Sequence, residues 1–421
     1  MNSSYCFVGA QAFVDGSLQA PADFWVENGK WVPGPVANAE MIEANGAWII
    51  PGLFALGVDF QEPIRDDVYT LKDGLEAMRR GGFAEALYES AANPVDDIQK
   101  LKAMQDACGK SGLAFHFLGA LSVGHQGKAL AEMLELASGG VVGFGDGDHF
   151  PSGLRFLRLA MEYASMTKMR CFFQPSEKSL VGKGCVHEGH FSDMLGMQGI
   201  PAQAETIAVH QILELAGWLQ VPVHLKQISC AESLNLIRHA RARGVDVSCD
   251  VSVNHLLFDD SGLFELDTNT RLLPPLRTLT DREALWQGLS DGTVQAISCA
   301  HHPVLPQDKD TNFEDAVPGA VSLEIAFAAL LPEALLRMKS GRNALIRLFV
   351  EGPAQILGVP VRSLALGHDE PFFVFSPGEE RLVKMSDFAG QVHNSPMLGK
   401  TLRGRVLGTM FDGSWRTNLW K

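Results

Sequence analysis

The hydrophobic positions of the chain form eight short apolar runs that begin near residue 48 and recur at fairly even intervals. Most runs contain β-branched or aromatic side chains, and glycine or proline often lies nearby. Continuous apolar runs of this length are typical of parallel strands that are buried on both faces. The runs are residues 48–56, 83–88, 114–121, 141–144, 169–173, 221–228, 245–251 and 294–299.

Segments with helical spacing separate these runs. Residues 204–219 place most of their apolar side chains on one side of a helix. Two further helices are predicted to start at capping boxes, Ser229-x-x-Glu232 and Thr280-x-x-Glu283. Strands that alternate with helices predict an α/β fold. A doubly wound sheet is the main alternative, but eight evenly cycling units favour a (β/α)8 barrel of the TIM type.

The two ends of the chain show a different pattern. Before residue 48, and again after about residue 365, short alternating segments are separated by glycine and proline. This pattern is typical of half-buried strands in a small sheet. We therefore expect residues 1–50 and 362–421 to build one composite β domain beside a barrel formed by residues 51–361.

Composition and charge narrow the class of protein. Hydrophobic residues make up 46% and charged residues 20%, as in ordinary globular proteins. The net charge of −14 argues against nucleic-acid binding, which needs clustered basic residues. The apolar stretch 320–336 is interrupted by charged residues and proline, so no membrane span is predicted. Seven scattered cysteines and the lack of a signal-peptide pattern indicate a cytoplasmic location.

In barrel enzymes the active site lies at the carboxyl ends of the strands. A hydrolytic metal site there needs three or more converging His or carboxylate ligands. The residual candidates are Asp59, Asp146 and His301. His302 is adjacent to His301 and would point to the opposite face, so at most one of the two faces the site. The simpler interpretation of the carboxylates is solvation or pairing with Lys226 or Arg65. Lys226 could neutralise such a site.

Longer motifs are distributed along essentially the whole chain. They are Pro51-Gly52-Leu53, Glu62-Pro63, residues 188–205, Pro274-Pro275-Leu276-Arg277, residues 281–285, residues 291–297, residues 352–358 and Asn394-Ser395-Pro396. Together these motifs resemble dihydroorotase of the amidohydrolase superfamily. The resemblance implies a barrel with a composite β domain and a metal-dependent opening of a cyclic amide.

The strand ends depart from what this resemblance implies. It implies metal ligands after strands one, four, five, six and eight, the last of which is also the general base. The residues at these positions are Gly57 and Asp59, Asp146, Gln174, Gln227 and Ala300, and of these Asp146 is the one residue that retains the implied type of ligand. The residues at the implied substrate-binding positions are Gln61, Ala91, Leu273 and Val304. We therefore expect no catalytic residue, no metal site and no cofactor.

These departures predict a catalytically inactive, dihydroorotase-like protein. The resemblance extends to non-catalytic chains that assemble with aspartate carbamoyltransferase in pyrimidine biosynthesis. It therefore implies the catalytic chain of that enzyme as partner, and self-association, without nucleic acid or membrane. One alternative is a cyclic-amide hydrolase whose zinc is held by a rebuilt site around Asp59, Asp146 and His301. A weaker alternative is a small-molecule sensor that uses the old pocket.

Overall fold

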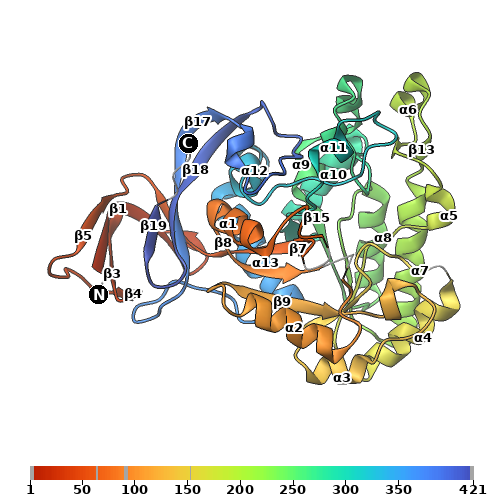
Figure 1. Ribbon diagram of the computed structural model, residues 1–421, viewed down its shortest axis with the longest axis horizontal. Helices are drawn as coiled ribbons and strands as arrows, with labels where there is room; N and C mark the ends of the chain where they lie inside the picture. Colours follow the sequence, from red (N-terminus) through yellow and green to blue (C-terminus); the bar gives the residue numbers. More distant parts are fainter. Residues whose placement is uncertain (1–3, 63–64, 90–92, 152, 418–421) are drawn as a thin grey trace.

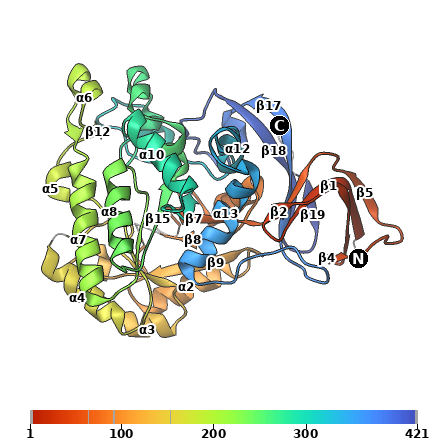
Figure 2. The same ribbon diagram turned by 180° about the vertical axis from the view of Figure 1, so that it is seen from behind.

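The computed structural model describes residues 4–62, 65–89, 93–151 and 153–417. It consists of a barrel and a separate β sheet, which lie side by side along the long axis of the molecule (Figure 1 and Figure 2). The predicted α/β barrel with a β domain built from both ends of the chain is confirmed.

Eight parallel strands form the barrel, in the spatial order β16-β15-β14-β11-β10-β9-β8-β7. Most of their residues are buried, which explains the continuous apolar runs in the sequence. The strands are β7 (Leu53–Val58), β8 (Phe83–Tyr88), β9 (Ala114–Gly119), β10 (Gly143–Gly145), β11 (Cys171–Phe173), β14 (Val223–Leu225), β15 (Val247–Ser252) and β16 (Ala296–Ser298).

A short seam between β7 and the chain after β16 closes the barrel. Val58 and His301 form an isolated parallel bridge. The amide of His301 donates to the carbonyl of Gly57 at 2.9 Å, and the carbonyl of His301 accepts from the amide of Asp59 at 3.1 Å. The seam therefore lies at the carboxyl ends of the first and last barrel strands.

The first predicted strand is two strands. Residues 48–56 divide at Gly52 into β6 (Trp48–Pro51), which belongs to the β sheet, and β7, which belongs to the barrel. A Cβ on Gly52 would lie 2.2 Å from the Cβ of Ala84, so the chain passes β8 too closely for a side chain. The prediction of one strand was wrong because an apolar run does not show where the chain changes sheets.

Helices cover the outside of the barrel (Figure 1). The longer helices are α1 (Leu71–Gly81), α2 (Ile98–Cys108), α4 (Leu154–Ser165), α7 (Gln203–Leu219), α8 (Ala231–Ala242), α10 (Leu279–Ser290), α12 (Ala326–Arg337) and α13 (Gly341–Leu357). The shorter elements are η1 (Val123–His125), α3 (Met133–Ser138), α5 (Lys178–Val181), β12 (Val186–His187), α6 (His190–Leu195), β13 (Gly199–Ile200), α9 (Val253–Leu257), η2 (Asp260–Glu265), η3 (Thr268–Thr270) and α11 (Pro306–Lys309). Within the described ranges, no helix has the length and apolar character needed to cross a bilayer.

The predicted helix 204–219 is confirmed as α7. The predicted start of α10 was displaced by two residues. Its N-cap is Thr278, whose hydroxyl accepts from the amide of Asp281, while the carboxylate of Asp281 accepts from the amide of Thr278. The capping box therefore uses Thr278 rather than Thr280.

The β sheet combines strands from both ends of the chain, in the order β19-β18-β17-β6-β1-β3-β4, with β2 and β5 paired to β1. Its strands are β1 (Ser4–Val14), β2 (Ser17–Leu18), β3 (Ala22–Glu27), β4 (Lys30–Val32), β5 (Glu40–Glu43), β6, β17 (Phe372–Leu382), β18 (Thr401–Met410) and β19 (Trp415–Thr417), and η4 (Met385–Asp387) lies between β17 and β18. The long β17 connects the two ends because it pairs antiparallel with both β6 and β18.

Phenylalanine side chains join the sheet to the barrel helices. The ring of Phe327, on α12, lies edge-on to Phe373 and Phe375 of β17, at centroid distances of 6.1 and 5.1 Å. On its other side, Phe327 contacts Phe349 of α13 at 6.1 Å. Since all four rings are buried, this cluster connects the β domain to the barrel through apolar packing.

We predict that Phe327→Ala lowers the free energy of unfolding by about 3–5 kcal/mol, because it leaves a cavity at the junction of sheet and barrel. Urea unfolding followed by circular dichroism measures this change. Leu336→Ala is the matched control, since Leu336 lies on the same helix and is 79% exposed. The control should change the free energy by no more than about 0.5 kcal/mol. Equal effects of the two variants would contradict this account of the junction.

Candidate functional site

A cavity of about 280 Å³ opens at the carboxyl ends of the barrel strands. Its size is near the lower limit for small-molecule pockets, which is about 300 Å³. The strand ends contribute Gly57, Asp59, Glu89, Gly147, Asp148, Gln174, Lys226, Gln227, Ser252, Asn254, His255, Ala300, His301 and His302. We call this region the barrel mouth.

Three positions that the resemblance assigns to metal ligands do meet in the barrel mouth. A Cβ on Gly57 would lie 3.7 Å from the Cα of Ala300 and 3.7 Å from Nε2 of Gln227. All three residues have left-handed backbone conformations, with φ of 67°, 46° and 51° for Gly57, Ala300 and Gln227. The strand ends therefore bring these positions together, but only an amide side chain and a methyl group are present there.

The remaining positions form internal contacts. The side-chain amide of Gln174 donates to the carbonyl of Leu273 at 3.2 Å, and both residues border the cavity. Val304 is buried, and its amide donates to the side chain of Asn394 at 3.1 Å. Ala91 lies outside the described residues.

The carboxylate of Asp59 borders the cavity and is held by its neighbours. It accepts from the backbone amide of Gln61 at 2.9 Å and from the side-chain amide of Gln61 at 3.1 Å. Nδ1 of His302 lies 3.6 Å from the same carboxylate. Gln61 therefore orients Asp59 rather than facing a ligand in the cavity.

Asp146 does not line the cavity, whose lining includes Gly147 and Asp148 instead. Its buried carboxylate accepts from the amides of Leu121 and Ser122, at 2.8 and 3.0 Å, and from the Ser122 hydroxyl. Burial raises the pKa of Asp146, and the hydrogen bonds from Ser122 act against it. Asp146 therefore fixes the loop that follows β9.

His301 is buried in the seam. Its Nδ1 accepts from the amides of Ser322 and Leu323 at 3.2 and 3.4 Å, so Nε2 carries the proton of the neutral ring. The ring packs against Phe60 and Tyr69. Burial, together with the charge of His302, lowers the pKa of His301 to about 3. A ring that uses its lone pair in this way has none left for a metal ion.

An ion pair that was not predicted from the sequence crosses the barrel mouth. The ammonium of Lys226, after β14, contacts the carboxylate of Glu89, after β8. The side chains of Lys226 and Glu89 are only 7% and 11% exposed. Pairing of Lys226 with Asp59 or Asp146 was expected, but Lys226 forms its ion pair with Glu89. The only signal for Glu89 was its place directly after a strand.

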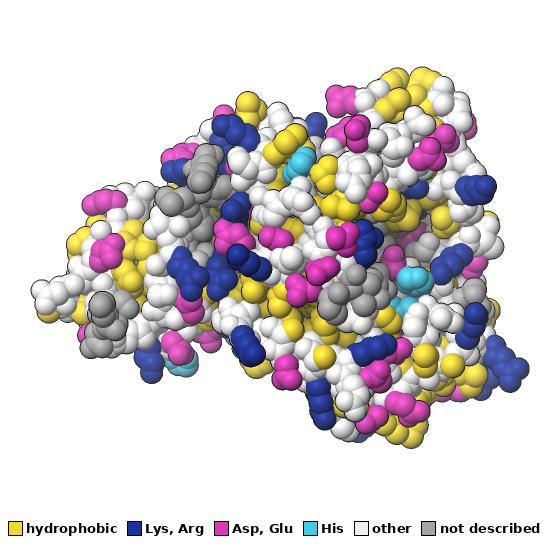
Figure 3. Space-filling view, viewed as in Figure 1, with side chains coloured by type: hydrophobic (Ala, Val, Ile, Leu, Met, Phe, Trp, Pro, Cys, Tyr) yellow, Lys and Arg dark blue, Asp and Glu magenta, His cyan; other side chains and the backbone are white. Residues whose placement is uncertain are grey.

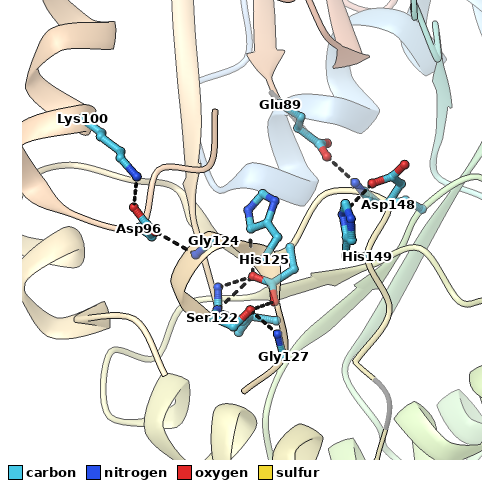
Figure 4. Close-up of polar contacts among 12 residues, drawn as sticks. Glu89, Asp96, Lys100, Ser122, Gly124, His125, Gly127, Asp148 and His149 are labelled. Atoms are coloured by element: carbon cyan, nitrogen blue, oxygen red, sulfur yellow. Dashed lines mark hydrogen bonds and ion pairs between the residues drawn. The ribbon is translucent and has the colours of Figure 1, made fainter. Parts of the chain in front are cut away.

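A second acidic and basic pair lies beside the first. Figure 4 shows Glu89 and Asp148 pointing toward the same space, with His149 next to Asp148. Nδ1 of His149 lies 2.9 Å from the Asp148 carboxylate, and this hydrogen bond raises the pKa of His149. Partial burial would raise the pKa of Asp148, but His149, Lys226 and His302 lower it to about 2.

A buried polar network supports the other side of the mouth. Glu205, on α7, accepts from the amide and hydroxyl of Ser229, from the amide of Cys230 and from the hydroxyl of Ser233. Nε of Arg277 donates to the Ser229 hydroxyl at 3.1 Å. The predicted capping box at Ser229 is not formed, because the N-cap of α8 is Cys230 and the Ser229 hydroxyl donates to Glu205 and accepts from Arg277.

A zinc ion, which the resemblance implies, does not fit this set of donors. The assigned positions offer two glutamine amides, a glycine, an alanine and two carboxylates, of which Asp59 is held by Gln61 and Asp146 by Leu121 and Ser122. Zinc prefers imidazole, thiolate and carboxylate ligands. Across the part of the chain that the structure describes, no group of three or more His, Cys, Asp or Glu residues is arranged to bind a metal.

Comparison with known proteins gives the family. No family model matches the chain. The chain is 33% identical over 382 residues to a dihydroorotase of Pelotomaculum thermopropionicum, covering 90% of this chain and 88% of that protein. It is 30% identical over 419 residues to a dihydroorotase of Desulforapulum autotrophicum, covering 97% of each.

Solved structures show the same architecture. L-hydantoinase (dihydropyrimidinase) from Arthrobacter aurescens matches 99% of this chain and 96% of its own, with a TM-score of 0.83 and 19% identity. A D-hydantoinase matches 99% and 95%, with a TM-score of 0.81 and 17% identity. The fold is therefore that of these hydantoinases. The sequence comparisons show that this chain belongs to the dihydroorotase family.

We predict that His301 makes folding sensitive to acid. Its pKa is about 3 when folded and about 6.5 in an unfolded chain, so between these values the unfolded state binds more protons. The stability contributed by the neutral ring is complete above about pH 6.5 and is lost as the pH falls toward 3. From pH 7 to 5, the wild type should lose about 2 kcal/mol more than His301→Gln.

Urea unfolding at pH 7, 6 and 5 measures this difference. His210→Gln is the control, because His210 is exposed on α7 and its replacement should leave the pH dependence unchanged. If His301→Gln and His210→Gln lose stability as steeply as the wild type, the protonation of His301 does not contribute.

Proposed function

We propose that this chain is a catalytically inactive member of the dihydroorotase family. The observation that carries the proposal is the meeting of Gly57, Gln227 and Ala300 in the barrel mouth without a metal-binding side chain among them. Water that is not bound to a metal keeps a pKa near its bulk value of about 15.7, against about 7 on zinc. The methyl group of Ala300 cannot accept a proton, so neither the nucleophile nor the base is supplied.

The contacts of the three residual candidates support inactivity over a rebuilt zinc site. Asp59 is held by Gln61, Asp146 by the loop at Ser122, and the lone pair of His301 by backbone amides. A rebuilt site would need all three to turn toward one point. Each turn would leave buried amides or a hydroxyl without an acceptor, which costs about 1–3 kcal/mol for each group.

The proposed role is assembly with the catalytic chain of aspartate carbamoyltransferase, in the cytoplasm, together with self-association. The identity of the partner rests on the resemblance to dihydroorotases. A protein partner in general is supported by apolar side chains on the adjacent helices α4 and α7. Trp218, on α7, is 63% exposed and lies under the guanidinium of Arg158, and Met166, the C-cap residue of α4, is 66% exposed. Exposed apolar surface of this kind often marks a protein interface.

We predict that the chain, purified without chelator or added zinc, contains far less than one transition-metal ion per chain and does not hydrolyse dihydroorotate. Elemental mass spectrometry and an absorbance assay measure the two quantities. The control is an active dihydroorotase carried through the same purification. Stoichiometric metal together with turnover would contradict the proposal and favour the rebuilt hydrolase.

We also predict that this chain forms a complex with the transferase catalytic chain encoded in the same genome. When the two chains are co-expressed, they should elute as one complex in size-exclusion chromatography. Transferase activity should depend on this chain, because the proposed role is assembly. The control is the tagged chain expressed without the transferase. Separate elution with equal transferase activity in both preparations would reject the assembly role while leaving the inactivity untouched.

A further inference from the structure

Three long loops form a cap above the barrel mouth. They are residues 182–200, 258–273 and 305–319, and we call them the loop cap. Arg271 ties two of the loops together, because it donates to the carbonyl of Cys185 at 3.0 Å. All three loops contribute side chains to one small apolar core, which consists of Cys185, Val186, Leu263 and Phe313. The loop cap is therefore a packed part of the fold with a core of its own.

Most of the charge of the loop cap is negative. Its 50 residues contain ten acidic and three basic side chains, which gives a net charge of −7, half of the −14 of the whole chain. Two of the three basic side chains, Arg271 and Lys309, are buried and donate to main-chain carbonyls inside the cap. The side chains of Glu188, Asp193 and Glu265 are exposed. The outer surface of the loop cap is therefore acidic.

Apolar side chains are exposed among these acidic ones. Phe264, in η2, is 60% exposed, and its ring lies edge-on to Phe191 of α6 at a centroid distance of 5.2 Å. Met194 is one helical turn after Phe191 and is also exposed. Aromatic and methionine side chains are enriched at protein interfaces. The loop cap therefore combines an apolar contact surface with negative charge.

The outer side of α4 combines an apolar contact surface with positive charge. Residues 154–170 contain four basic side chains and one acidic one, a net charge of +3 in an acidic chain. Arg155, Arg158 and Leu159 are exposed and lie within about 100° of one another around the helix axis. The guanidinium carbon of Arg158 lies 4.8 Å from the ring centroid of Trp218 on α7. We call this surface the α4 face, and it consists of Arg155, Arg158, Leu159, Met166, Lys168 and Trp218.

The two surfaces lie at the same end of the molecule. In both views, α4 and α6 are at the end of the long axis opposite the β sheet (Figure 1 and Figure 2). A two-fold axis at this end brings the α4 face of each copy toward the loop cap of the other, and closed two-fold dimers are the commonest homo-oligomers. We propose that the α4 face is the docking site for the loop cap of a second copy of this chain. The inference rests on the proposed self-association, for which it supplies the surface.

Charge selects this crossed arrangement. The net charge of −14 makes two copies repel each other in most relative orientations. Contact of the α4 face with the loop cap brings opposite charges together, whereas cap against cap or α4 face against α4 face brings like charges together. A second basic surface, at the end of α12, is less suited to the cap, because Arg337 there is already paired with Glu283 and Glu333.

The test exchanges charge between the two surfaces. The cap-reversed variant is Asp193→Lys/Glu265→Lys, and the α4-reversed variant is Arg155→Glu/Lys168→Glu; all four side chains are exposed in the wild type. Each variant alone should dissociate about 100-fold or more readily than the wild type, because like charges then meet at both contacts. An equimolar mixture of the two variants should dimerise again, since each contact then pairs opposite charges. Sedimentation velocity measures the dissociation constants, and circular dichroism checks that the variants are folded.

The matched control is Lys339→Glu/Arg342→Glu, which reverses two exposed basic side chains near the end of α12. It should dimerise like the wild type. Loss of the dimer in this control, dimerisation of either reversed variant alone, or a mixture that stays monomeric overturns the proposal. A monomeric wild type refutes this inference and the self-association together. A dimeric wild type whose reversed variants also dimerise refutes only this inference, and the metal content tests the inactivity separately.

The wild type provides a second measurement that needs no charge reversal. Raising the salt concentration from about 0.05 to 0.5 M should increase its dissociation constant about 10-fold or more, because salt screens charges at an exposed contact. Phe264→Ala should weaken the dimer about 10-fold or more, as truncation of an interface aromatic does, whereas Leu336→Ala should leave it unchanged. A dissociation constant that responds neither to salt nor to Phe264→Ala contradicts the proposed contact.

Discussion

The closure of the barrel between β7 and β16 is the constraint on which the rest of the site depends. The seam is made by main-chain groups: the carbonyl of Gly57 and both backbone groups of His301. It requires left-handed conformations at Gly57 and Ala300. For Ala300 this conformation costs about 1–2 kcal/mol, and the barrel retains it although the methyl side chain forms no polar contact. The position of the strand end is therefore set by closure of the barrel.

Because the main chain closes the barrel, the side chains at these positions can change without opening it. This separation explains how a chain can keep the complete architecture of the amidohydrolases while its strand ends carry Gln174, Gln227 and Ala300. Surface charge does not constrain the fold as closure of the barrel does. Acidic and basic side chains are interspersed over the face shown in Figure 3. A fold that does not depend on the side chains at its metal-ligand positions can persist in a protein whose proposed role is assembly.

Most of the fold could be predicted from the sequence because buried strands and amphipathic helices leave local patterns. The predictions of local structure that were wrong failed for one of two reasons. Either a residue distant in the sequence determined the structure, or the local sequence offered two nearly equivalent arrangements. Gly52 divides an apolar run because Ala84 lies against it. Ser229 does not cap α8, whose N-cap is Cys230, and its hydroxyl instead donates to Glu205, 24 residues away. For α10, Thr278 and Thr280 each begin a sequence that could form a capping box, and the local sequence does not determine which of the two forms.

The site was less predictable, because residue identity does not determine how a side chain is used. That Gln227 and Ala300 occupy positions where the resemblance implies metal ligands was a prediction from motif spacing. The pairing of Lys226 with Glu89 was not, because 137 residues separate the two. The role of His301 could not be predicted from its residue type either. It lies where metal ligands were expected, but its Nδ1 accepts hydrogen bonds from backbone amides and its neutral ring has a structural role. The chemistry of the mouth therefore follows from its hydrogen bonds, and these depend on the closed barrel.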